Sequence, residues 1–248
     1  ACGTSVLVES MASDIHGLIV PGTGTASQEK LSQLDDVYPH NNLTISEKLQ
    51  ISLYMAQSLA DLHGHEGGPI IHSDTHPEQW LLAKDGSLKL NDFNNAYTQE
   101  FNDEKNQYCL YASRFPNGVY RSPEEFKGDF QDKSVDTYAF GNNIYALLTG
   151  LWPYYDEEFK QVPHDKIQQD IINGKRPYVD QRFVSRSYIE TQLVQIMIQC
   201  WGQREKRPSM SSIASYLEKV KGIAMKKGEL ESSGLIDIPP PPISDNID

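Results

Sequence analysis

Cysteine, basic charge and long apolar runs are all scarce in this sequence. Its 248 residues include three cysteines, which lie far apart and form no Cys-x-x-Cys pair: Cys2, Cys109 and Cys200. A zinc site or a redox pair needs closer spacing, so idle thiols in a reducing compartment are the simpler interpretation. No run of about 18 apolar residues occurs, and we therefore expect no membrane segment in this chain.

The charge balance is acidic. Aspartate and glutamate number 34 against 22 lysines and arginines, which gives a formal net charge of -12 at pH 7. Such an excess repels phosphate backbones and anionic lipids, and no local basic patch offsets it. We therefore expect no nucleic-acid partner. The hydrophobic content of 38% is ordinary for a globular protein, so a folded domain is expected.

The periodicity of apolar residues predicts a mainly helical domain. Thr44 and Glu47 form a capping box before a long amphipathic helix, which is expected to end near the glycines of residues 63–68. Further helices are predicted at residues 135–148, 187–201 and 209–224. Residues 17–28 and 94–121 have no sustained period and are expected to be loops. The predicted fold class is α+β, mainly α, with a small two-stranded patch.

Three regions are expected along the chain. Residues 4–11 have the pattern of a buried strand with no turn or cap before it, and the chain begins with Ala, so we expect a fragment. Residues 1–12 then belong to the edge of a preceding lobe, and residues 13–224 form the main unit. Residues 225–248 include the acidic, proline-rich "IDIPPPPISDNID" and are expected to be a disordered tail.

A polar segment, "HSDTHPEQ" at residues 72–79, lies between two short apolar runs. These runs predict small paired strands on either side of it. Asp74 on this loop can accept a proton from a substrate hydroxyl, or it can cap the following turn. His72 suits a packing role. A zinc site with His76 is not expected, because the spacing supplies no third ligand.

A second acid, Asp92, ends the strand of "LKLNDF". The ends of the two strands could bring Asp74, Gln79 and Asp92 together. Oxygen ligands of this kind suit Mg²⁺, which takes one or two carboxylates together with substrate phosphates and waters. Two acids alone are weak evidence for a magnesium site. Their order in the chain, relative to the other motifs, is more specific evidence.

The order of the motifs resembles the C-terminal lobe of a protein kinase, nearest to the tyrosine-kinase-like serine/threonine type. The family's catalytic loop, which starts with H-R-D and ends with Asn, aligns without gaps on the loop from His72 to Gln79. D-F-G falls on residues 92–94 and A-P-E on residues 122–124. "DTYAFGNNIYALLTGLWPY" resembles the central helix, "QIMIQCWGQREKRPSM" the final core helices and "LVESM" the hinge strand.

The resemblance implies a role for each matching residue. Asp74 accepts the proton of the substrate hydroxyl, and Asp92 binds Mg²⁺ that bridges the ATP phosphates. Glu124 pairs with Arg207 in a buried structural ion pair. Asp136 supports the catalytic loop from beneath through the loop's backbone amides.

The remaining implied residues bind ATP or support the site. Glu9 and Met11 flank the adenine through main-chain contacts, and His72 and Phe93 are structural. The implied partners are ATP and either a protein substrate or a partner protein. The expected location is cytoplasmic, or the cytosolic side of a membrane if an anchor was lost upstream.

Four positions depart from the family's pattern. Ser73 replaces the arginine that pairs with a phosphorylated activation segment, so control by that charge is not expected. His76 stands where a lysine touches the transferred phosphate, and an unperturbed histidine is mostly neutral at pH 7. Gln79 replaces the metal-binding asparagine and is one methylene longer. Asn94 replaces glycine, and asparagine tolerates positive φ better than other non-glycine residues.

Two functions remain open from the sequence. The first is a divergent, ATP-dependent serine/threonine protein kinase domain with Asp74 and His76 at the catalytic position and Mg²⁺ on Asp92 and Gln79. The second is a pseudokinase that binds a partner protein. The Gly-rich loop, the strand lysine and the helix glutamate of the family precede the hinge and are not in this sequence, so the chain as given is expected to be inactive.

Overall fold

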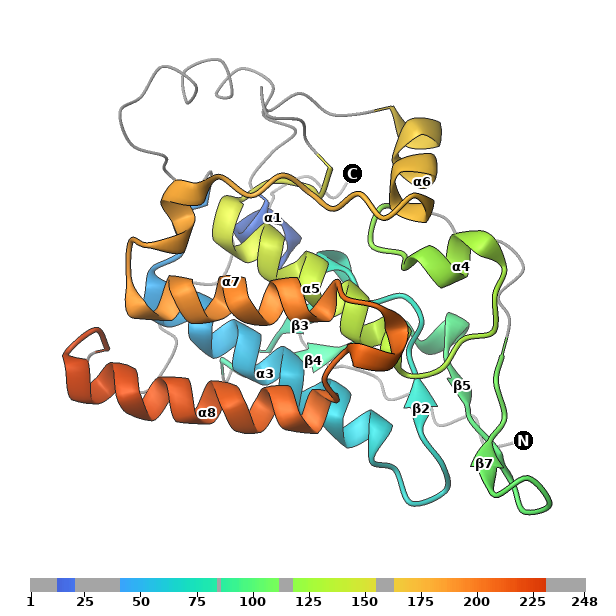
Figure 1. The fold of residues 1–248 in the computed structure, drawn as a ribbon. Coiled ribbons are helices and arrows are strands. Elements are labelled where there is room, and N and C mark those ends of the chain that lie inside the picture. Colours follow the sequence, from blue (N-terminus) through green and yellow to red (C-terminus); the bar gives the residue numbers. More distant parts are fainter. Residues whose placement is uncertain (1–12, 21–40, 84–85, 112–117, 155–162, 231–248) are drawn as a thin grey trace, which may run out of the picture.

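The computed structural model describes residues 13–20, 41–83, 86–111, 118–154 and 163–230 (Figure 1). The expected hinge strand, with Glu9 and Met11, lies outside these residues, and so does the proline-rich end of the chain. Helices dominate the fold, as the periodicity predicts. Within the described ranges, no helix combines the length and the hydropathy that a bilayer-spanning segment needs.

Four long helices form the body of the domain: α3 (Ile45–His63), α5 (Ser134–Thr149), α7 (Tyr188–Cys200) and α8 (Met210–Lys227). The side chain of Thr44 accepts a hydrogen bond from the backbone nitrogen of Glu47, which completes the predicted capping box. Ser187 and Ser209 cap α7 and α8 in the same manner.

The end of α8 corrects the predicted tail boundary. Residues 225–227 are helical, and the helix closes at Gly228, which has a φ of 72°. A left-handed residue of this kind ends the helix after Lys227, and glycine adopts that conformation without steric cost. The predicted tail therefore begins too early, because the closing glycine lies beyond the last clearly periodic residue.

Three shorter helices accompany these four: α1 (His16–Ile19) before α3, α4 (Pro123–Lys127) before α5 and α6 (His164–Ile172) before α7. Helix α1 corrects the prediction of a loop from residue 17. Ile15 and Ile19 lie one turn apart and are fully buried, and the backbone nitrogen of Ile19 donates to the carbonyl of Ile15. One buried pair is enough to fix a single turn but too short to produce a recognisable period.

The strands form more than the predicted two-stranded patch. β1 (Ser13–Asp14), β3 (Trp80–Leu82) and β4 (Leu88–Leu90) make an antiparallel sheet in the order β1-β3-β4. Two further antiparallel pairs are present: β2 (Ile70–Ile71) with β5 (Tyr97–Thr98), and β6 (Phe101–Asn102) with β7 (Gln107–Tyr108). Segments of two residues carry too little pattern to be recognised in the sequence.

The core lies between the long helices. α3 lies beside α8, and α5 packs against α7 (Figure 1). Every residue of α5 from Val135 to Thr149 is buried. The close approach of α5 and α7 requires glycine at residue 141, because a Cβ atom there would lie 2.9 Å from the Cβ of Cys200 and 3.0 Å from the Trp201 ring. The central helix is therefore fixed in the core, and its polar residues can hold the loop beside it.

Candidate active site

Asp136, in the first turn of α5, supports the loop of residues 72–79. Its Oδ2 accepts a hydrogen bond of 2.9 Å from the backbone nitrogen of His72, and its Oδ1 accepts one of 2.8 Å from that of Ser73. The ring of His63, at the end of α3, donates to Oδ2 at 3.0 Å. The predicted support through backbone amides is therefore present, and the contact with His63 adds to it.

The pKa of Asp136 reflects these contacts. Burial of the side chain raises the pKa, but the hydrogen bond and the charge interaction with His63, with a further contribution from His72, hold it below its usual range. The carboxylate consequently stays ionised in the interior, where it satisfies two loop amides. A buried anion with this many donors keeps the loop in one conformation.

His72 joins the loop to the end of β4. Its side chain is fully buried, and Nε2 donates to the carbonyl of Asn91 at 2.8 Å. The ring meets Phe93 edge-on, with 4.9 Å between the ring centroids. Phe93 itself is 47% exposed, so it covers the histidine from the solvent side. This link places Asp92 next to the loop.

Asp92 lies in the left-handed region, with φ 60° and ψ 69°, and a short 3-10 helix of Phe93–Asn95 follows it. Asparagine at residue 94 would tolerate positive φ, but its backbone does not adopt it. Asn94 is inside the 3-10 turn, whereas Ser73 and Asp92 carry the unusual backbone conformation, at φ 64° and 60°. Such residues occur where the surrounding contacts determine the backbone, which is common at functional sites.

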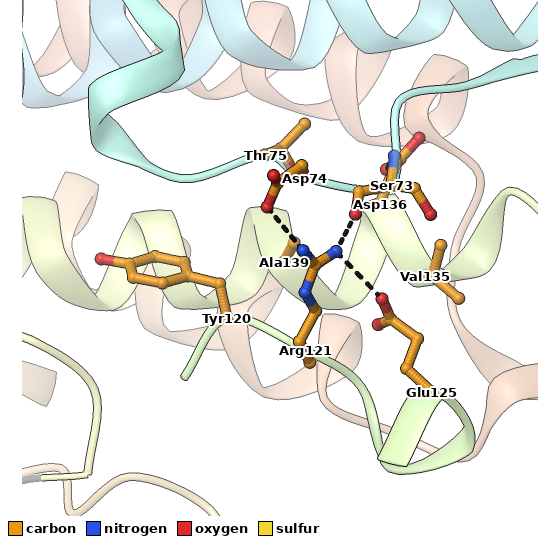
Figure 2. Close-up of a pocket in the computed structure, with 9 residues that line it drawn as sticks. All are labelled: Ser73, Asp74, Thr75, Tyr120, Arg121, Glu125, Val135, Asp136 and Ala139. Carbon is orange, nitrogen blue, oxygen red and sulfur yellow. Dashed lines mark hydrogen bonds and ion pairs between the residues drawn. The ribbon is translucent and has the colours of Figure 1, made fainter. Parts of the chain in front are cut away.

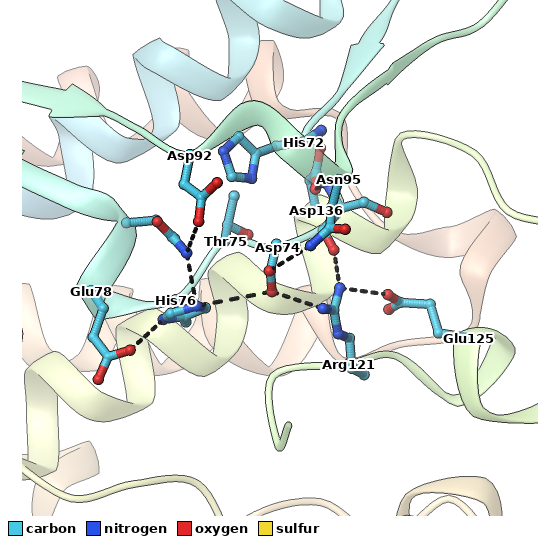
Figure 3. A network of polar contacts seen from close by, with 12 residues as sticks. His72, Asp74, Thr75, His76, Glu78, Asp92, Asn95, Arg121, Glu125 and Asp136 are labelled. Carbon is cyan, nitrogen blue, oxygen red and sulfur yellow. Dashed lines mark hydrogen bonds and ion pairs between the residues drawn. The ribbon is translucent and has the colours of Figure 1, made fainter. Parts of the chain in front are cut away.

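A chain of side chains connects the two acids (Figure 3). The amide nitrogen of Gln79, in the 3-10 turn Pro77–Gln79, donates to Oδ2 of Asp92 at 3.3 Å and contacts Nε2 of His76 at 3.1 Å. The same His76 nitrogen lies 3.9 Å from Oδ1 of Asp74. The predicted grouping of Asp74, Gln79 and Asp92 is therefore present, with His76 between them.

His76 is neutral in this arrangement. Burial lowers its pKa, although the carboxylates of Asp74 and Glu78 raise it in part. The amide of Gln79 donates to Nε2, which leaves the ring proton on Nδ1. The residue therefore offers no fixed positive charge at the position where the family's lysine stands.

Asp74 is held by two residues that sequence reasoning does not single out. The amide nitrogen of Asn95 donates to Oδ2 at 2.9 Å, and Nη2 of Arg121 donates to Oδ1 at 2.7 Å (Figure 3). The Asp74 side chain remains 21% exposed, so a substrate can still reach it. Both partners stand beside a recognised motif, Asn95 directly after residues 92–94 and Arg121 directly before residues 122–124, which is the signal that could have identified them.

The space between Arg121 and the loop is nearly filled (Figure 2). A cavity of about 10 Å³ remains there. It is lined by the loop residues Ser73, Asp74 and Thr75, by Arg121 and Asp136, and by four further side chains. This volume is close to the minimum that holds one water molecule. A substrate must therefore approach Asp74 from its exposed side.

Glu124 and Arg207 form the predicted ion pair away from the loop. Two guanidinium nitrogens of Arg207 contact the two carboxylate oxygens of Glu124, with Nη2 and Oε2 3.0 Å apart. Arg207 also donates to the carbonyls of Ser134 and Gly202 and lies over the ring of Tyr138. Because both side chains are buried, loss of one partner is expected to cost about 3–5 kcal/mol.

A comparison with known protein families identifies the family of this chain. The protein kinase domain matches residues 25–217, which is most of the chain. This chain belongs to the protein kinase domain family. The resemblance read from the sequence and the mainly helical kinase-like fold are thereby confirmed.

Curated relatives of this kinase domain are identical to it at about a quarter of the aligned residues. Integrin-linked protein kinase 1 of Arabidopsis thaliana is 27% identical over 188 residues, which cover 75% of this chain and 38% of that protein. The probable serine/threonine-protein kinase gdt8 of Dictyostelium discoideum is 28% identical, over 77% of this chain and 13% of that protein. A putative serine/threonine-protein kinase/receptor, R826, of Acanthamoeba polyphaga mimivirus is 27% identical, over 70% of this chain and 9% of that protein.

The chain thus spans less than two fifths of the length of these relatives. Protein kinases in general use ATP and Mg²⁺. In the part of the kinase domain that the structure describes, no three His, Cys, Asp or Glu side chains gather as a metal site. A magnesium ion that is also bound by ATP phosphates and waters needs only one or two protein ligands.

Asp92 and Gln79 fit such a site. One carboxylate and one amide, 3.3 Å apart, match the small donor set that Mg²⁺ uses when phosphates and waters complete its coordination. Gln79 presents its amide nitrogen to Asp92, and a half-turn of the amide exchanges that nitrogen for the oxygen. Because the Gln79 amide already lies 3.3 Å from Asp92, the extra methylene of glutamine does not move this side chain away from the acid.

Proposed function

We propose that, within the full-length protein, this domain takes part in the transfer of a phosphoryl group from ATP to a serine or threonine hydroxyl of a protein, with Asp74 as the proton acceptor. The observation that carries the proposal is the proximity of the two acids: Gln79 joins Asp92 to His76, whose Nε2 lies 3.9 Å from Oδ1 of Asp74. It sets the metal-binding residues and the acceptor carboxylate on the same side of the domain.

Asp74 is suited to accept the proton. Asn95 and Arg121 fix the orientation of its carboxylate, and its partial exposure leaves access for a hydroxyl group. A positioned carboxylate within hydrogen-bond reach can take the hydroxyl proton as the oxygen attacks phosphorus. The loop that carries it is held from below by Asp136, so its position is set before a substrate binds.

Asp92 and the amide oxygen of Gln79 are the residues that would hold Mg²⁺. When bound, this ion neutralises negative charge on the phosphate oxygens. Asp92 needs no backbone rearrangement for this task, because its left-handed conformation already directs the carboxylate toward Gln79.

Transfer of labelled phosphate by the full-length natural protein tests the proposal. The Asp74→Asn variant removes the acceptor but keeps the size of the side chain, and we expect its turnover to fall by about 10²-fold or more. Asp61→Asn, on the exposed side of α3, is the matched control and should retain wild-type turnover. Equal activity of the Asp74 variant and the control would refute the assigned role.

A second candidate function is a pseudokinase that binds a partner protein without transferring phosphate. Two observations favour it: the amide nitrogen, not the oxygen, of Gln79 faces Asp92, and both oxygens of Asp74 already accept hydrogen bonds. A thermal-shift measurement separates the two functions. Stabilisation by ATP that requires Mg²⁺ and is lost in Asp92→Asn supports the enzyme, and its absence in the wild-type protein supports the binding module.

A further inference from the structure

Two contacts of Arg121 are with the catalytic loop, and a third is with helix α4. Its Nη2 donates to Oδ1 of Asp74 at 2.7 Å, and its Nη1 donates to the backbone carbonyl of Ser73 (Figure 2). The same Nη1 lies 3.3 Å from Oε1 of Glu125. One planar guanidinium therefore joins two consecutive loop residues to helix α4.

The guanidinium is itself held in place. Glu125 is almost completely buried and belongs to the capping box at the start of α4, where it also accepts hydrogen bonds from Ser122. The Arg121 side chain is 14% exposed, so its charge is only weakly screened by solvent. A fixed, poorly solvated fork of donors orients a carboxylate more strictly than a flexible lysine does.

The loop needs such a contact. Ser73 has a φ of 64°, a conformation that costs free energy in a residue other than glycine and persists only where neighbouring contacts enforce it. Asp136 holds the backbone nitrogen of Ser73, and Arg121 holds its carbonyl. The residues at positions 73 and 76 are a serine and a histidine, and neither side chain is a permanent cation as an arginine is.

We propose that Arg121 is the positioning residue for Asp74: it fixes the acceptor carboxylate and places a permanent positive charge beside it. This inference rests on the proposed phosphate transfer. It assigns the site a residue from the segment before α4, outside the loop and outside the D-F-N motif.

Kinetics of the full-length natural protein test the role of Arg121. Arg121→Gln is expected to lower kcat by about 10²-fold through misplacement of the acceptor, while KM for ATP changes less than about twofold. Arg121→Lys should retain part of the activity. His76→Lys added to Arg121→Gln should recover at least about tenfold of the loss, because a lysine at residue 76 restores a cation near Asp74.

Arg186→Gln is the matched control. Arg186 also precedes a helix and pairs with a buried glutamate four residues later, its Nε lying 3.6 Å from Oε2 of Glu190. It lies just before α7 and makes its ion pair within that helix, so its loss should leave kcat unchanged. If Arg121→Gln folds poorly, the double variant Arg121→Gln/Glu125→Gln takes its place. The second substitution removes the buried carboxylate that the first leaves without its arginine.

Three kinetic outcomes would overturn the inference. If Arg121→Gln is as active as the wild-type protein or more active, the contact is inert or inhibitory. If His76→Lys recovers nothing, or Arg186→Gln loses as much activity, then Arg121 acts only through the stability of the fold.

Hydrogen exchange of the amides at residues 72–76 gives a readout that does not need activity. We expect faster exchange in Arg121→Gln and no change in Arg186→Gln. If the wild-type protein transfers no phosphate but this difference is seen, the proposed function fails while the positioning contact stands. Unchanged exchange in Arg121→Gln refutes the positioning itself.

Discussion

At the scale of single residues, Asp136 shows how a buried charge serves the site. Its two oxygens accept the amides of His72 and Ser73, and His63 donates to it from another helix. Hydrogen bonds from these three donors offset the free-energy cost of burying the carboxylate. They also fix the loop backbone at the residues just before Asp74. The side chain touches no substrate, yet the site depends on it.

Replacement of Asp136 by asparagine is predicted to destabilise the domain by about 1–3 kcal/mol at pH 7, because one loop amide then faces an NH₂ group and loses its acceptor. The folded-state pKa of Asp136 is lowered, so its stabilisation is present above the unfolded-state value near pH 4 and disappears as the pH falls through the folded value. Urea unfolding at pH 7 and at decreasing pH measures both effects.

The Asp61→Asn variant should unfold like the wild-type protein throughout this series. Equal stability of Asp136→Asn and the wild-type protein at pH 7 would show that the loop does not depend on this carboxylate.

At the scale of secondary-structure elements, α3 carries an unusual buried lysine. Lys48 is 2% exposed, and its Nζ donates to the carbonyl of Leu148 at the end of α5. Burial lowers its pKa to about 8, although Glu190 raises it in part. The pairing of α3 with α5 is thus maintained at a cost that depends on pH.

Lys48→Met is predicted to stabilise the domain by about 2–3 kcal/mol at pH 7, because it removes a buried ammonium group. Between about pH 8 and the ordinary lysine value near 10.5, the unfolded chain still binds a proton that folded Lys48 has released. The wild-type protein therefore gains stability from Lys48 as the pH rises, and the advantage of Lys48→Met should shrink toward zero.

The difference in stability between the wild-type protein and Lys48→Met isolates the effect of Lys48. The Cys200 thiol is present in both proteins; burial raises its pKa, so it lowers the stability as the pH rises. Lys89→Met, an exposed lysine on β4, is the control and should show no pH-dependent difference. A constant stability difference for Lys48→Met from pH 7 to 10 would contradict the prediction.

At the scale of the whole molecule, local signals predicted the helices and long-range contacts decided the site. The capping box of Thr44 and Glu47 and the apolar periodicity are short-range patterns, and the long helices follow them closely. The contact of Arg121 with Asp74 joins residues 47 apart in the chain, and no local pattern contains it. The motif order therefore predicted the grouping of Asp74, Gln79 and Asp92 and the support by Asp136, but not Asn95 and Arg121, which bond the Asp74 carboxylate.

The smaller elements show the same limit. β1 is a strand only because Ser13 and Asp14 pair with Leu82 and Leu81, and two residues contain no periodicity of their own. The positive φ of Asp92 lies between the hydrogen bond of His72 to the Asn91 carbonyl and the 3-10 turn that follows, a setting that the local sequence does not display. Tertiary contacts determine these conformations, and a single sequence does not display them.

The central claim is that Asp74 and Asp92 face one nucleotide site, and paramagnetic broadening tests it most directly. With isotope-labelled full-length protein and ATP bound to Mn²⁺ in place of Mg²⁺, the account predicts broadening of amide resonances at both residues 73–75 and residues 91–93. The Asp92→Asn variant should lose this broadening in both segments together. Broadening of one segment without the other in the wild-type protein would contradict the account.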